Sequence, residues 1–101
     1  YMMQHTDNEE KRQGIHCIVT GRVQGVFFRN FTQSQATKLG LSGWVKNLAS
    51  GQVELRAFGS HASLMQLQQV LRSGPPMAKV EHIDSQSIPV EDWDVFSIAH
   101  E

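Results

Sequence analysis

Two stretches of this chain place apolar residues on one helical face, and both lie between segments with strand character. The first stretch starts at Phe28 and ends before Gly40, a residue type that commonly follows a helix C-terminus. The second follows Ser60, a good N-cap, and ends at Gly74-Pro75-Pro76. The apolar positions are Phe28, Phe31, Ala36 and Leu39 in the first stretch and Leu64, Leu67 and Leu71 in the second. Two amphipathic helices of this kind need an apolar surface to pack against.

That surface is predicted to be a β-sheet, because the remaining segments have β-branched content or strand-like alternation. The predicted strands are residues 15–20, 44–48, 52–58, 79–87 and 93–98. A short turn at Ala49-Ser50-Gly51 joins two of them into a hairpin. Val53, Leu55 and Ala57 alternate with polar residues, as in a sheet that is covered on one face. The order predicts an α+β fold, the ferredoxin-like α/β sandwich (βαββαβ), with two helices on one face of an antiparallel sheet.

Composition limits the class of protein. The chain has 101 residues, of which 40% are hydrophobic and 19% are charged, as in an ordinary globular domain. We predict one domain at residues 14–101, preceded by a polar and aperiodic flexible tail at residues 1–13. The net charge of −1 argues against bulk attraction to nucleic acid or to an anionic membrane. The sequence has no bilayer-spanning apolar run and no signal-peptide pattern, so we predict a cytoplasmic location.

The residue types that commonly bind metals or act as nucleophiles form no recognisable pattern. Cys17 is the single cysteine, and its apolar surroundings predict a small buried thiol. The histidines lack the spacing of metal ligands, and the acidic residues near the C-terminus are most simply a solvated edge. These residues are His5, His16, His61, His82 and His100, and Asp84, Glu91, Asp92 and Asp94. We therefore predict no metal site.

The segment GRVQGVFFRNF, residues 21–31, joins the first predicted strand to the first predicted helix. The first amides of a helix have no internal acceptor and carry partial positive charge. Nearby glycines let successive amides converge on one anion. The candidates for such a ring are the amides of Gln24, Gly25, Val26, Phe27 and Phe28, with the side chain of Arg29 at its edge.

Nucleotide-binding patterns do not fit this segment. A Walker loop needs lysine and then serine or threonine after its second glycine, and a dinucleotide fingerprint needs a third glycine. Gly25 is followed instead by Val26 and Phe27. On spacing alone the segment is compatible with a loop for one phosphoryl group or with an ordinary turn, and Arg29 with a phosphate ligand or a solvated side chain. Asn47 is likewise either a turn residue or a group that orients water.

Two stretches resemble the signatures of the acylphosphatase family. VTGRVQGVFFR, residues 19–29, resembles a phosphate loop of the form G-x-V-Q-G-V-x-F-R. GWVKNLASGQVELRAFG, residues 43–59, resembles the second signature of that family, including G-[aromatic]-V-K-N. The two occur at the expected separation, and the resemblance extends from about Ile15 to Ile98.

The resemblance implies hydrolysis of the carboxyl–phosphate bond of acyl phosphates to a carboxylate and inorganic phosphate. It implies that Arg29 binds phosphate, that Asn47 positions the attacking water, and that the amides from Gln24 to Phe28 form the cradle. In this family no metal, cofactor or covalent phosphoenzyme is needed. We expect a small acyl phosphate as substrate, inorganic phosphate as product and inhibitor, and a monomer that binds neither nucleic acid nor membrane.

The sequence departs from the family pattern at two positions. Phe27 stands where many bacterial members have glycine, and it is expected to narrow or stiffen the cradle. Leu48 stands where some members have threonine.

Two other interpretations are compatible with this fold. Acylphosphatase-like modules also occur inside larger carbamoyl-transferring maturation proteins, where the role would be non-catalytic binding of phosphate or acyl phosphate. The short chain favours a stand-alone enzyme. A ferredoxin-like RNA-binding domain would need exposed aromatic residues on its central strands within a basic surface, and residues 15–20 contain no aromatic residue.

Overall fold

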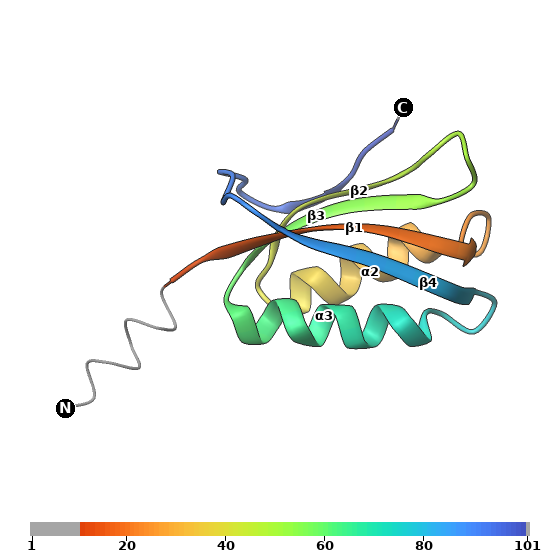
Figure 1. Cartoon of the computed structure of the whole chain (residues 1–101), viewed down its shortest axis with the longest axis horizontal. Coiled ribbons are helices and arrows are strands. Elements are labelled where there is room, and N and C mark those ends of the chain that lie inside the picture. Colours follow the sequence, from red (N-terminus) through yellow and green to blue (C-terminus); the bar gives the residue numbers. More distant parts are fainter. Residues whose placement is uncertain (1–10, 101) are drawn as a thin grey trace.

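The computed structural model describes residues 11–100 of the chain (Figure 1). Its elements are β1 (Gln13–Arg22), α2 (Phe28–Lys38), β2 (Ser42–Asn47), β3 (Val53–Gly59), α3 (His61–Ser73), β4 (Lys79–Ile88) and β5 (Phe96–Ile98). The predicted βαββαβ order is confirmed. Residues 1–10 of the predicted tail lie outside the described residues, as does His5, whereas Gln13 already belongs to β1.

The sheet has the strand order β4-β1-β3-β2-β5, and it is mixed rather than wholly antiparallel. The β1–β3, β1–β4 and β2–β3 pairs are antiparallel, as predicted, but β5 pairs in parallel with β2. The reason is the path of the chain after β4. It reverses direction and crosses from the β4 edge to the opposite edge, where β2 already runs in that direction. The last strand is also shorter than predicted, because Trp93 lies in the connection, where its Nε1 donates a hydrogen bond to Glu91 (2.9 Å).

Both helices cover the same face of the sheet, as Figure 1 shows, and this part of the prediction is confirmed. The core between the layers contains the predicted faces of β1, β3 and the two helices. Its fully buried members include Cys17, Val53, Leu55, Leu67 and Leu71. Cys17 is the buried thiol that the sequence predicted, and burial raises its pKa. The second helix begins as predicted, with the Ser60 hydroxyl accepting from the amide of Ser63 (3.1 Å).

The opposite face of the sheet has polar side chains paired across the strands. His16 Nε2 lies 2.7 Å from Glu54 Oε2, which joins β1 to β3. Arg56 of β3 forms an ion pair with Glu91 in the connection that leads to β5. Hydrogen bonds from Trp93 and from Arg56 hold the pKa of Glu91 below its ordinary value. Part of the acidic C-terminal region is therefore paired with the sheet rather than merely solvated.

Gly43 permits the close approach of β2 and β3. Its φ is +131°, and a Cβ atom at this position would lie 2.0 Å from the carbonyl oxygen of Arg56. Gly51, in the β2–β3 turn, also has a positive φ, +95°, but a Cβ atom there would meet no described atom within 4 Å. A substitution at Gly51 therefore tests the free-energy cost of the backbone conformation alone, whereas one at Gly43 adds the cost of a steric clash.

We expect Gly51→Ala to lower the free energy of unfolding by about 1–2 kcal/mol, because alanine disfavours a positive φ. Gly43→Ala should lower it by a further ~1–3 kcal/mol, because its methyl group is forced against β3. Urea denaturation of both variants measures the difference. Equal losses would show that β2 and β3 move apart without penalty and would contradict this account.

Candidate active site

The loop between β1 and α2 ends in a strained residue at the start of the helix. Phe27 is the N-cap of α2 and has left-handed backbone angles, φ 63° and ψ 24°. This conformation costs a non-glycine residue about 1–2 kcal/mol. The first hydrogen bond of the helix runs from the amide of Phe31 to the carbonyl of Phe27 (3.0 Å). The amides of residues 28–30 thus have no intrahelical acceptor, and the side chain of Phe27 does not cap them within the described structure.

Gln24 ties this loop to the β2–β3 turn. Its Nε2 donates two hydrogen bonds, to the carbonyl oxygens of Leu48 and Gln52, each 2.8 Å long. A second link comes from Gln52, whose Nε2 donates to Thr20 Oγ1 in β1 (2.9 Å). These bonds fix the loop beside the end of β2, where Asn47 lies.

A cavity of about 240 Å³ opens between this loop and the end of β2. Its lining residues are Val23, Gly25, Phe27, Phe28, Arg29, Asn30 and Asn47. The predicted residues Arg29 and Asn47, distant in sequence, therefore lie at one cavity. Gln24 and Val26 are not among the lining residues, whereas Val23 and Asn30 line the cavity although the sequence had not singled them out. The position of Asn30 in the first turn of α2 is the signal that would have found it.

Two of the polar side chains at the cavity, those of Asn47 and Arg29, are available to a ligand. The Oδ1 atom of Asn47 is buried and has no hydrogen-bond partner among residues 11–100. A buried acceptor without a partner is rare in folded proteins, and water or a ligand commonly satisfies it. Arg29 is half-buried and pairs with no carboxylate in the described chain. The cavity thus offers an acceptor on one wall and a permanent cation on another.

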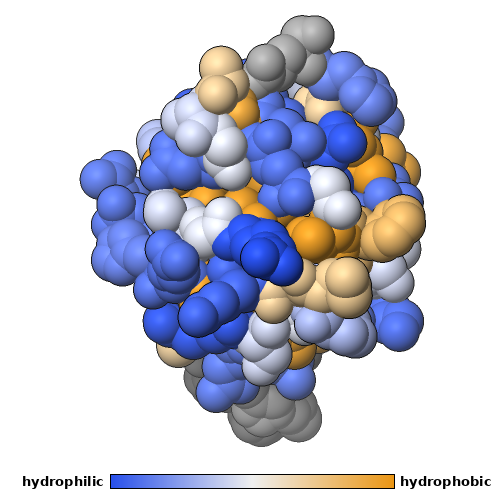
Figure 2. Space-filling view, turned by 90° about the vertical axis from the view of Figure 1, so that its right-hand side faces the viewer, coloured by the Kyte–Doolittle hydropathy of each residue, from blue (hydrophilic) through white to orange (hydrophobic). Residues whose placement is uncertain are grey.

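The surface at this end of the molecule is mixed in character. Figure 2 shows this end of the molecule from the front, with hydrophilic and hydrophobic residues side by side.

Among the described residues no three His, Cys, Asp or Glu side chains are grouped as metal ligands would be. No helix in residues 11–100 combines the length and apolar character that a membrane crossing requires.

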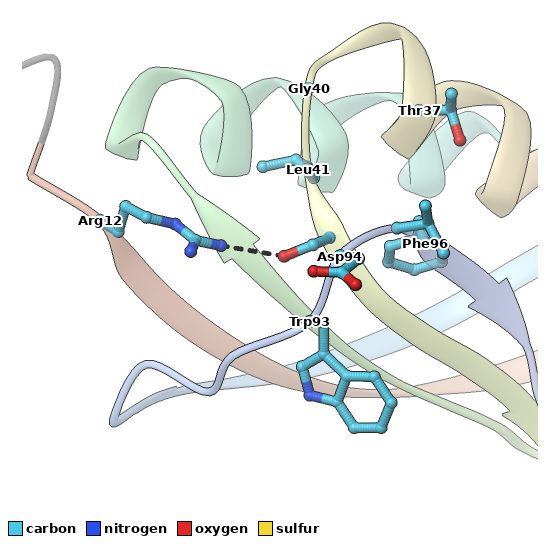
Figure 3. Close-up of a pocket in the computed structure, with 9 residues that line it drawn as sticks. Arg12, Thr37, Gly40, Leu41, Trp93, Asp94 and Phe96 are labelled. Carbon is cyan, nitrogen blue, oxygen red and sulfur yellow. Dashed lines mark hydrogen bonds between the residues drawn. The ribbon is translucent and has the colours of Figure 1, made fainter.

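A larger cavity, about 420 Å³, lies at the opposite end of β2 and α2 (Figure 3). Arg12 and Asp94 line it, and Arg12 Nη2 donates to Ser42 Oγ (2.9 Å). The residues lining this cavity include neither Arg29 nor Asn47. The predicted residues Arg29 and Asn47 therefore line the smaller of these two cavities.

The family model for acylphosphatase matches residues 15–98 of this chain. The chain belongs to the acylphosphatase family. It is 45% identical over 93 residues to an acylphosphatase of Coxiella burnetii (strain Dugway 5J108-111). This alignment covers 92% of this chain and 98% of that protein. A solved acylphosphatase structure from Coxiella burnetii matches the fold with a TM-score of 0.85 at 45% identity, over 87% of this chain and 93% of that one. The structure of the Bacillus subtilis acylphosphatase matches with a TM-score of 0.84 at 40% identity, over 86% and 98% of the two chains.

We expect Gln24→Ala to lower the free energy of unfolding by about 1–3 kcal/mol, because the carbonyls of Leu48 and Gln52 each lose one of their two donors and the loop loses its link to the turn. The variant should also lose turnover, because the loop and Asn47 are no longer held together. Gln33→Ala is the matched control, since Gln33 Nε2 donates to the carbonyl of Phe96 (3.1 Å) and neither residue lines the cavity. Urea denaturation and steady-state kinetics compare the two. Turnover by Gln24→Ala equal to that of Gln33→Ala would refute the coupling.

Proposed function

We propose that this acylphosphatase-family chain hydrolyses the carboxyl–phosphate bond of acyl phosphates to a carboxylate and inorganic phosphate. The observation that supports this most directly is the joint presence of Arg29 and the unpartnered Oδ1 of Asn47 at one cavity beside a helix N-terminus. The first can hold an anion, and the second can hold a water molecule next to it. Both are needed for attack by water on a bound phosphoryl group.

In the proposed mechanism the phosphoryl group lies in the loop, bound by backbone amides between Gln24 and Phe28, and of these residues Gly25, Phe27 and Phe28 line the cavity. The guanidinium of Arg29 grips two phosphate oxygens with its planar fork. Amides and guanidinium together offset the negative charge that develops on the equatorial oxygens in the transition state. The backbone amides are already oriented by the loop and the helix before the substrate arrives, so they need little reorganisation during the reaction.

Asn47 positions the nucleophile. Its Oδ1 accepts a hydrogen bond from a water molecule and holds it in line with the bond that breaks. The oxygen of this water forms the new bond to phosphorus, and the bond from phosphorus to the acyl oxygen breaks with its electron pair leaving on the carboxylate. A carboxylate is a weak base, so its departure requires little acid catalysis.

The proton released by the water is proposed to pass to a phosphate oxygen of the substrate. The lining residues described for the cavity include no carboxylate and no histidine. The substrate therefore supplies the base. The chain's own residues orient the reacting groups and stabilise charge, and no residue of the chain forms a covalent intermediate.

Further properties follow from the same proposal. Inorganic phosphate, as the product, should compete with substrate for the loop. We propose that the protein acts as a monomer in the cytoplasm, and that its single domain begins at β1 with Gln13. A non-catalytic binding module would bind phosphate equally well, so turnover is the property that separates the two functions.

We expect the purified protein to hydrolyse benzoyl phosphate and acetyl phosphate in the presence of EDTA. Arg29→Ala should lower kcat/KM by about 100-fold or more and weaken inhibition by phosphate, because binding and charge stabilisation are lost together. Arg72→Ala, at an exposed arginine in the last turn of α3, is the control and should behave as wild type. Wild-type protein without turnover in this assay would refute the proposed function.

Asn47→Ala should lower kcat by about 100-fold, because the water is no longer placed in line, while the inhibition constant of phosphate changes little. Steady-state kinetics with phosphate as competitive inhibitor measure both quantities. Retention of the wild-type kcat would show that Asn47 does not position the water.

A further inference from the structure

Phe27 is an aromatic residue that the fold does not bury. The residue is 77% exposed, whereas its neighbour Phe28 is 1% exposed and belongs to the core. Phe28 also packs against Phe31, with ring centroids 6.4 Å apart. Single exposed apolar residues are common and need no explanation by themselves. The position and backbone of Phe27 set it apart.

Phe27 has a backbone conformation that favours glycine. Its φ of 63° is close to the 73° of Gly25 in the same loop. A bulky residue in the left-handed region is a genuine outlier, and such residues cluster at functional sites. Since the ring contributes nothing to the core, packing does not explain why a phenylalanine stands at this strained position.

Phe27 is one of the residues that line the cavity of Arg29 and Asn47. At about 240 Å³ this cavity is smaller than the roughly 300–1,000 Å³ of sites that enclose a whole organic ligand. In the proposed mechanism it holds the phosphoryl group, with water beside Asn47. In-line attack puts the acyl oxygen on the side of phosphorus away from that water. The acyl group therefore extends out of the cavity toward its exposed rim, where Phe27 offers apolar surface.

We propose that the ring of Phe27 is a platform for the acyl group, so that the enzyme prefers aromatic or extended apolar acyl phosphates to acetyl phosphate. This inference rests on the proposed function. Aromatic and apolar groups gain from contact with a phenyl ring, and an acetyl methyl group covers little of it. The backbone amide of Phe27 serves the phosphoryl group of every substrate, whereas its side chain distinguishes between acyl groups.

The contact is made by a part of the substrate that does not react. It is present in the bound substrate and in the transition state alike, so it should act mainly on KM and only weakly on kcat. A residue that merely shaped the loop would change kcat for all substrates equally. The relevant measurement is therefore the ratio of kcat/KM for benzoyl phosphate to that for acetyl phosphate.

The test compares wild type with Phe27→Asn and Phe27→Tyr. Asparagine tolerates the left-handed conformation and removes the ring, and tyrosine keeps the ring. We expect Phe27→Asn to lower the benzoyl-to-acetyl ratio about 3- to 10-fold, mostly through KM for benzoyl phosphate. Phe27→Tyr should keep the ratio within about twofold. The ratio is independent of the fraction of folded enzyme, because both substrates are measured with one preparation.

An unchanged ratio in Phe27→Asn would overturn this inference while leaving the proposed function intact. A ratio that falls equally in Phe27→Tyr and Phe27→Asn would also overturn it, because loss of the ring would not be the cause. Absence of turnover by wild type with both substrates would overturn the proposed function, and this inference with it.

Discussion

The arrangement of the candidate site depends on the hydrogen bonds that the side-chain amide of Gln24 donates. Two loops that are separated by more than twenty residues meet because its Nε2 donates to the carbonyls of Leu48 and Gln52. One loop carries the helix N-terminus and Arg29, and the other follows the strand that ends at Asn47. Neither group is useful to the proposed chemistry without the other. The glutamine of the first family signature thus acts on the turn contained in the second.

The positive character of the cavity is local. The chain carries a net charge of −1, so long-range attraction to anions is weak. In the proposed mechanism, anion binding depends instead on the amides at the start of α2 that have no intrahelical acceptor and on Arg29. Such a site acts over a short range, and the proposed substrate is recognised through its phosphoryl end rather than drawn in by the surface as a whole.

The sequence predicted most of the fold, because its helices and central strands carry strong periodic patterns. Leu64, Leu67 and Leu71 form the buried stripe of α3, as expected from their spacing. The parallel pairing of β5 was missed, since strand direction depends on where the chain crosses the sheet and not on a local pattern. The sequence also did not predict that the Gln24 side chain binds the β2–β3 turn, nor that Phe27 has a left-handed backbone. Both depend on contacts or backbone angles that tertiary structure imposes.

The two edges of the sheet are protected in different ways. On one side β5 pairs with residues Gly43 to Val45, so the strand that carries Asn47 is not an open edge over that length. On the other side β4 is a long edge strand, and it presents exposed charged or titratable side chains such as Glu81, His82 and Asp84. Charged side chains on an edge oppose pairing with another chain. Two copies of this sheet are therefore disfavoured from pairing edge to edge through β4, although the same sheet carries an apolar core on its helix-covered face.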